Sequence, residues 1–152
     1  MSNILSVSDL SYYYQDGDTR RYILNKATRE FERGKFYAIL GASGSGKTTF
    51  LALISALDDP KEGSILYDGA DIKSIGFENY RRNKIGIVFQ SYNLIPNLTV
   101  KENIETGAYL SEHPLDIDEI LKTLGLWEHL NKIPNQLSGG QQQRTAIGRA
   151  VV

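Results

Sequence analysis

Nine residues, Gly41 to Thr49, constrain this chain more than any other segment. Their sequence, GASGSGKTT, matches the pattern GxxxxGK[S/T], in which a glycine-rich loop precedes a lysine and a hydroxyl residue. Glycines have no Cβ, so successive backbone N–H groups of such a loop can point inward and bind phosphate oxygens. Lys47 is placed to reach the terminal phosphates of a nucleotide, and the Thr48 hydroxyl is an oxygen ligand suited to Mg²⁺. The pattern therefore predicts a nucleotide-binding loop.

The segments on either side of the loop support this interpretation. Residues 36–40 form a short apolar run, as expected of a buried parallel strand. Apolar residues between Phe50 and Leu57 recur at the spacing of one helix face. They predict a helix that begins near Gly46 and directs its positive N-terminal end at the phosphates. The alternative is a glycine-rich turn that only caps a helix, and the flanking patterns favour the phosphate loop.

Composition excludes several classes of protein. The 17 Lys and Arg residues balance 18 Asp and Glu residues, so no overall field attracts nucleic acid or anionic lipid. The absence of cysteine excludes disulfides, thiol catalysis and cysteine-based zinc sites. The sequence shows no secretory leader and no apolar run of about 18 residues. We therefore expect any role at a membrane to come through a partner.

The patterns along the chain change character after residue 90. Residues 1–90 are mixed α/β, with further strands predicted at 4–14, 22–31, 64–67 and 85–89. The first of these is rich in tyrosine and is expected to be exposed or at a sheet edge. Residues 91–152 have only helical patterns. We therefore predict two domains, a nucleotide-binding α/β core at 1–90 and a helical subdomain at 91–152.

Two capping boxes mark helix starts in the second part. Thr99 and Glu102 have the Ser/Thr-x-x-Glu spacing and predict a helix that ends near Leu110. Ser138 and Gln141 have the related spacing and predict a final helix that continues to the end of the chain.

The sequence around the second capping box is itself a motif, LSGGQ at residues 137–141. Ser138 as N-cap, with Gly139 and Gly140 in the first turn, makes an uncluttered helix N-terminus that can bind an anion. Taken alone, the motif is equally explained as a helix cap with small residues for packing. Beside the 41–49 loop it has a further meaning, because it is identical to the signature sequence of the ATP-binding cassette (ABC) family. The whole chain resembles that family.

The resemblance implies a P-loop NTPase (RecA-like) core of the α/β class, with an antiparallel β part at the N-terminus and an α-helical subdomain. Gln90 matches the Q-loop glutamine, which in the family contacts Mg²⁺ and the attacking water; otherwise it is a polar strand end. Tyr14 matches the aromatic residue that stacks on adenine, a role for which Tyr12 and Tyr13 compete. The implied nucleotide-binding set is Tyr14, Gly41, Ser43, Gly44, Ser45, Gly46, Lys47, Thr48, Thr49, Gln90, Ser138, Gly139, Gly140 and Gln141. Its implied catalytic members are Lys47, Gln90 and Ser138, and its implied metal ligands are Thr48 and Gln90.

The implied function is that of the ATP-binding subunit of an ABC transporter. Such a subunit binds MgATP, forms a head-to-tail dimer with a second nucleotide-binding subunit, and drives a separate membrane permease from the cytoplasmic face. Residues 90–104 are similar to the subfamily of lipoprotein-release, macrolide-export and peptide-resistance transporters. The alternatives are a non-transport ABC ATPase and a catalytically inactive nucleotide-binding module. Near-neutral charge argues against nucleic acid as a partner.

The family pattern continues beyond the signature helix to a Walker B aspartate, a catalytic glutamate and a switch histidine, none of which this sequence contains. Asp71, Asp116 and Asp118 follow no apolar strand and cannot replace the Walker B aspartate. We therefore expect a chain truncated before Walker B, without the C-terminal core strands and with little ATP hydrolysis. The apolar runs at 36–40 and 85–89 are then expected to lack neighbours.

Four further polar residues have simpler interpretations. Arg144 and Arg149 lie on the predicted final helix, where they either add positive potential near a partner's phosphate or make local ion pairs. His113 and His129 have no metal-ligand spacing and are expected at the surface.

Overall fold

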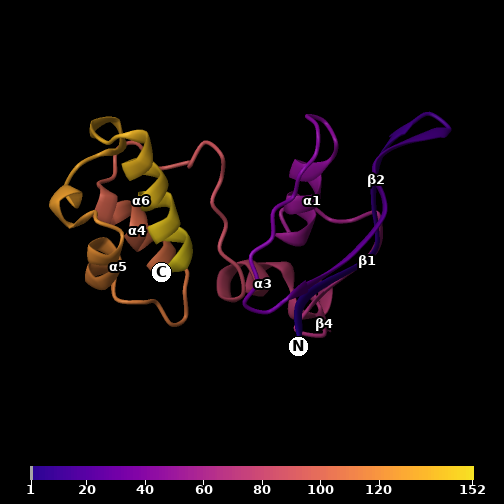
Figure 1. Ribbon diagram of the computed structural model, residues 1–152, viewed down its shortest axis with the longest axis horizontal. Coiled ribbons are helices and arrows are strands. Elements are labelled where there is room, and N and C mark those ends of the chain that lie inside the picture. Colours follow the sequence, from indigo (N-terminus) through magenta and orange to yellow (C-terminus); the bar gives the residue numbers. More distant parts are fainter. Residues whose placement is uncertain (1) are drawn as a thin grey trace. The chain divides into compact units, whose positions relative to one another are not determined.

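The computed structural model describes residues 2–152, which form two compact units, one ending at Arg81 and the other beginning at Arg82 (Figure 1). Within residues 2–152, no helix is both long enough and apolar enough to cross a membrane. The division of the chain into domains at residue 90 stays a prediction.

The first unit is built on a four-stranded antiparallel sheet with the order β2-β1-β3-β4. β1 (Asn3–Asp16) and β2 (Thr19–Glu32) form the long hairpin drawn in indigo in Figure 1. β3 (Glu62–Tyr67) pairs with the other edge of β1, and β4 (Ala70–Asp71) pairs with β3. β1 is therefore a central strand, because β3 returns from far along the chain to pair with it. Of the predicted alternatives, exposed or at a sheet edge, the edge position is wrong, while Tyr14 near the end of the strand is exposed.

Three helices accompany this sheet: α1 (Lys47–Ile54), α2 (Ile72–Ile75) and α3 (Phe77–Asn83). The Tyr80 hydroxyl donates a hydrogen bond to the Ile54 carbonyl over 2.9 Å and so links α3 to the end of α1. Burial raises the pKa of Tyr80 to about 12. The apolar side chains buried in this unit are Val7, Leu10, Leu53, Ala56, Ile65, Ile72 and Tyr80.

The two predicted buried strands do not form. Residues 36–40 form no helix or strand, and Phe36 and Leu40 are 96% and 89% exposed. Residues 85–89 are also unpaired, and Val88 and Phe89 are partly exposed. A β-strand needs a hydrogen-bonded neighbour, and the sheet of residues 2–152 consists of β1 to β4 alone. These segments keep the composition of buried strands but have no strand beside them.

The second unit is helical, as predicted. It contains α4 (Val100–Ala108), α5 (Ile117–Thr123) and α6 (Gly139–Val151), with the 3-10 helices η1 (Trp127–His129) and η2 (Pro134–Gln136) between the last two. In Figure 1, α4 lies beside α6, which is drawn in yellow, and α5 packs against α4. Its core consists of Val100, Ile104, Ile120, Leu121, Leu126, Leu137 and Val152.

Both predicted capping boxes are confirmed. In α4, the Thr99 side chain accepts from the Glu102 N–H and the Glu102 carboxylate accepts from the Thr99 N–H. The hydrogen bond from the Thr99 backbone lowers the pKa of Glu102. In α6, Ser138 and Gln141 exchange the same pair of bonds over 3.2 and 2.9 Å. Each box fixes the point at which its helix begins.

Candidate functional site

The 41–49 loop has the backbone geometry that its glycines predict. Gly44 and Gly46 have φ angles of 78° and 91°, in the region that favours glycine. A Cβ on Gly46 would also lie 2.9 Å from the Ile23 carbonyl oxygen of β2, so the loop fits against the hairpin only with glycine there. α1 begins at the next residue, Lys47. The predicted loop and helix are confirmed, whereas the strand before them is not formed.

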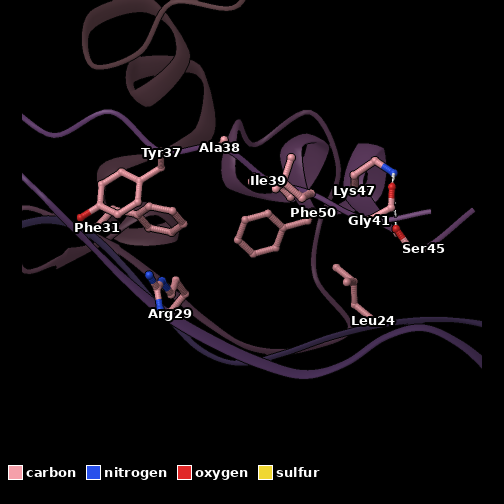
Figure 2. Close-up of a pocket in the computed structure, with 12 residues that line it drawn as sticks. Leu24, Arg29, Phe31, Tyr37, Ala38, Ile39, Gly41, Ser45, Lys47 and Phe50 are labelled. Atoms are coloured by element: carbon pink, nitrogen blue, oxygen red, sulfur yellow. Dashed lines mark hydrogen bonds between the residues drawn. The ribbon is translucent and has the colours of Figure 1, made fainter. Parts of the chain in front are cut away.

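Lys47 places its ammonium group over this loop. Its Nζ atom lies 2.5 Å from the Gly41 carbonyl oxygen and 3.5 Å from the Ser45 Oγ (Figure 2). It also lies 2.7 Å from the Ala42 carbonyl oxygen. Residues 41–45 and Thr48 are exposed. A positive charge is thus held above an accessible loop at the N-terminus of α1, whose first N–H groups have no acceptor within the helix.

A pocket of about 420 Å³ opens beside the loop. One end is polar and carries Ser45 and Lys47, while the remainder is mainly apolar (Figure 2). Phe31 contacts both Tyr37 and Phe50, with ring centroids 5.0 and 6.3 Å apart. Residues 37–40 form part of the apolar wall. The sequence predicted them to be buried in a sheet, so it did not indicate that they line a pocket beside the loop.

The first unit therefore fits a phosphate group. The loop leaves open the space that a Cβ on Gly44 would occupy, and the donor set of lysine ammonium, helix N–H groups and threonine hydroxyl suits phosphate oxygens. The Thr48 hydroxyl also has the hard-oxygen chemistry of a Mg²⁺ ligand.

Tyr14 lies near the end of β1, and 59% of its surface is exposed. Its ring contacts that of Tyr12 edge-on at 5.7 Å, so both face the same side of the hairpin. Tyr12 pairs with Leu24, which lines the pocket. Tyr13 faces the other side, where it packs against Tyr22 at 5.1 Å.

Tyr12 is already engaged on the shared face. Its hydroxyl donates to the Asp58 carboxylate over 2.8 Å, and this hydrogen bond raises the pKa of Tyr12 to about 12. Tyr13 faces away from the pocket side and the Tyr12 hydroxyl is bonded to Asp58, so Tyr14 is the tyrosine best placed to stack on a base.

Gln90 lies in the second unit, exposed and in a turn. The strand expected before it is absent, for the reason given above. Its proposed relation to Mg²⁺ and to water stays a prediction.

The LSGGQ motif forms the start of α6. Ser138 is the N-cap, and Gly139 and Gly140 follow in the first turn. A Cβ added to either glycine would meet nothing within 4 Å. The packing of the second unit therefore does not require glycine at these positions, and the bare helix end remains open to a group from outside the unit.

The sequence predicts His129 at the surface and gives no sign of its contacts. His129 is half-buried, and its Nε2 lies 3.0 Å from Nε2 of Gln141. The Ser138 N–H donates to Oε1 of Gln141, which fixes the orientation of the amide. The amide nitrogen therefore donates to His129, whose Nε2 must be the unprotonated ring nitrogen. Since the two residues are twelve positions apart, no local spacing could have revealed this contact.

The first unit carries a glycine-rich loop that leads into a helix beside an antiparallel sheet, and the second unit is helical; together these features define a P-loop NTPase fold. Comparison with known proteins gives the family: residues 24–152 match the model described as ABC transporter. The chain belongs to the ABC transporter family.

Individual relatives agree with this assignment. The chain is 42% identical over 154 residues to the ABC transporter ATP-binding protein MG065 homolog of Mycoplasma pneumoniae, covering 97% of this chain and 33% of that protein. It is 38% identical over 157 residues to the macrolide export ATP-binding/permease protein MacB of Brucella melitensis, covering 98% and 24%. The ATP-binding cassette MJ0796, solved as a dimer with ADP and Pi, has a TM-score of 0.83 and 37% identity, covering 97% and 68%. The chain thus spans about a third or less of the length of these two sequence relatives.

Proposed function

We propose that this chain binds MgATP and acts as the nucleotide-binding part of an ABC transporter. The observation that carries the proposal is the exposed glycine loop at the start of α1, with the Lys47 ammonium held over it. In this proposal the loop N–H groups and Lys47 bind the β- and γ-phosphates. Thr48 and Gln90 would hold the Mg²⁺ ion, which would neutralise negative charge on the phosphates.

The resemblance to the family and the dimeric cassette MJ0796 support a second part of the proposal. Two nucleotide-binding subunits, identical or different, associate head to tail, so that Ser138, Gly139 and Gly140 of one face the ATP held by the other. In the complete transporter, ATP hydrolysis in this dimer drives a membrane permease that holds the assembly at the cytoplasmic face. The permease, and not this chain, selects the substrate.

Calorimetric titration of the chain with nucleotides tests the first part. We expect MgATP and MgADP to bind at one site per chain and tripolyphosphate to compete with them, because the loop recognises phosphates. AMP is expected to bind far more weakly. Equal binding of AMP and ATP, or no saturable binding of MgATP, would contradict the proposal.

Replacement of Tyr14 tests the adenine contact. Tyr14→Ala is expected to weaken MgATP binding about two- to tenfold, because stacking of aromatic rings contributes about 0.5–1.5 kcal/mol. Tyr14→Phe, which keeps the ring, should bind as the parent chain does, and so should Tyr13→Ala, whose ring faces the other side of the hairpin. Tripolyphosphate has no base, so its affinity should not change in any variant. If Tyr14→Ala weakens ATP and tripolyphosphate equally, Tyr14 shapes the loop and does not contact adenine.

A further inference from the structure

Arg149 connects the last turn of α6 to the residues that follow Gln90. Its Nη2 donates to the Tyr92 carbonyl and its Nη1 donates to the Asn93 carbonyl, each over 2.6 Å. Both acceptors are neutral backbone groups, so neither expectation from the sequence, an ion pair or a charge directed at a partner's phosphate, describes this side chain. The planar guanidinium suits such a contact because its two terminal nitrogens can serve two neighbouring acceptors.

The backbone at the receiving end is in an uncommon conformation. Tyr92 and Asn93 have φ angles of 61° and 49°, two consecutive non-glycine residues in the left-handed region. This conformation is unfavourable for an L-residue, and less so for asparagine. In this arrangement of the turn, both carbonyls accept from the same guanidinium. Arg149 therefore stabilises a local structure that the turn would not favour alone.

The donating end is fixed in the core of the second unit. Gly107 of α4 has no room for a side chain because the Arg149 carbonyl lies against it, and Gly86 is packed in the same way against the Ala150 carbonyl. Burial lowers the pKa of Arg149. The guanidinium is thus held between a rigid helix end and the 91–93 turn.

We propose that Arg149 is a positioning residue that makes the segment after Gln90 and the signature helix move together. Gln90 lies two residues before the first accepting carbonyl, and Ser138 caps the other end of the same helix. A displacement of the Gln90 segment is therefore transmitted through Arg149 and α6 to the LSGGQ end. In the proposed dimer, this contact links the nucleotide bound by one subunit to the signature that the same subunit presents to its partner. The inference rests on the roles proposed above for Gln90 and the signature.

Amide hydrogen exchange tests the link, first without nucleotide. Arg149→Met keeps the apolar stem and removes both donors, so exchange at residues 91–93 is expected to rise at least tenfold. Exchange in α4 should stay as in the parent chain. Arg144→Met removes an exposed arginine from the same helix and is the matched control. Unchanged exchange at 91–93 in Arg149→Met would overturn the inference, whether or not the chain binds ATP.

The second arm adds saturating MgATP at a protein concentration too low for dimerisation. In the parent chain and in Arg144→Met, we expect ATP to change exchange at residues 90–93 and also at 138–142. In Arg149→Met, the change at 138–142 should fall at least fivefold while that at 90–93 persists. Arg149→Lys, which keeps the charge with a single donor group, should be intermediate and carries the test if Arg149→Met does not fold. A full response at 138–142 in both variants would contradict the inference, whereas absence of MgATP binding to the parent would contradict the proposed function instead.

Discussion

Lys47→Ala is expected to reduce MgATP binding by about 100-fold or more, because it removes at least two hydrogen bonds between an ammonium group and phosphate oxygens. Hydrogen bonds to charged groups contribute about 1.5–3 kcal/mol each, and 1.4 kcal/mol corresponds to a factor of ten in affinity. Calorimetric titration with MgATP measures the loss directly. The Lys47 ammonium already lies over the loop without nucleotide. The loss of affinity is therefore expected to come from contacts between this ammonium and the phosphates, and not from a rearranged loop.

Two controls separate this effect from a loss of folding or of general positive charge. Lys35→Ala removes an exposed lysine outside the loop and should leave affinity unchanged. Thermal unfolding of Lys47→Ala should stay close to that of the parent chain, because the contacts it loses within the chain are exposed. If Lys47→Ala folds normally and binds MgATP as tightly as the parent, the 41–49 segment is only a helix-capping turn.

The features predicted well from the sequence are those decided by neighbours along the chain. The capping boxes at Thr99 and Ser138 depend on residues three positions apart, and both form as predicted. The start of α1 likewise follows from the glycines before Lys47. Such geometry can be predicted from local sequence because the side chain and the backbone group that it binds lie within one helical turn.

The errors concern partners that lie far along the chain. Residues 36–40 have the composition of a buried strand, but pairing depends on a neighbouring strand that local sequence does not specify. The prediction that β1 is exposed or at an edge rested on its loose alternation and its tyrosines, neither of which indicates that residues of β1 pair with β3 on the second side. The contacts of His129 and Arg149 cross 12 and 56 or more positions and left no spacing to detect. The long-range contacts of the site could therefore be found only in the structure.

Substitution at the signature is expected to abolish ATP-dependent association while leaving ATP binding by the single chain nearly intact. The N-terminus of α6 carries the equivalent of about half a positive charge, and Gly139 and Gly140 leave it uncovered. Placed against the phosphates of a partner's ATP, it adds attraction only when nucleotide is present. Sedimentation with a non-hydrolysable ATP analogue, compared with nucleotide-free protein, measures this association.

Two substitutions distinguish loss of the phosphate contact from loss of helix stability, because one lowers and the other raises the stability of α6. Ser138→Arg removes the N-cap, at a cost of about 1 kcal/mol in stability, and places a bulky side chain where the phosphates would lie. Gly139→Asp keeps Ser138 and adds a negative charge that favours the helix N-terminus by about 0.3–1 kcal/mol, but this charge repels phosphate. Both should prevent ATP-dependent dimerisation, so helix stability cannot explain a shared loss.

Gln143→Arg serves as the control, since it adds charge to an exposed position further along α6 and should dimerise as the parent does. If Ser138→Arg and Gly139→Asp both dimerise with the analogue like the parent, residues 137–141 only cap α6. If only Ser138→Arg fails, the loss follows from the weakened cap, because the charge introduced by Gly139→Asp would then face no phosphate. Loss in both variants, with unchanged nucleotide affinity in each, is the result that a composite site between two subunits requires, because only there does the signature act on a nucleotide that its own chain does not hold.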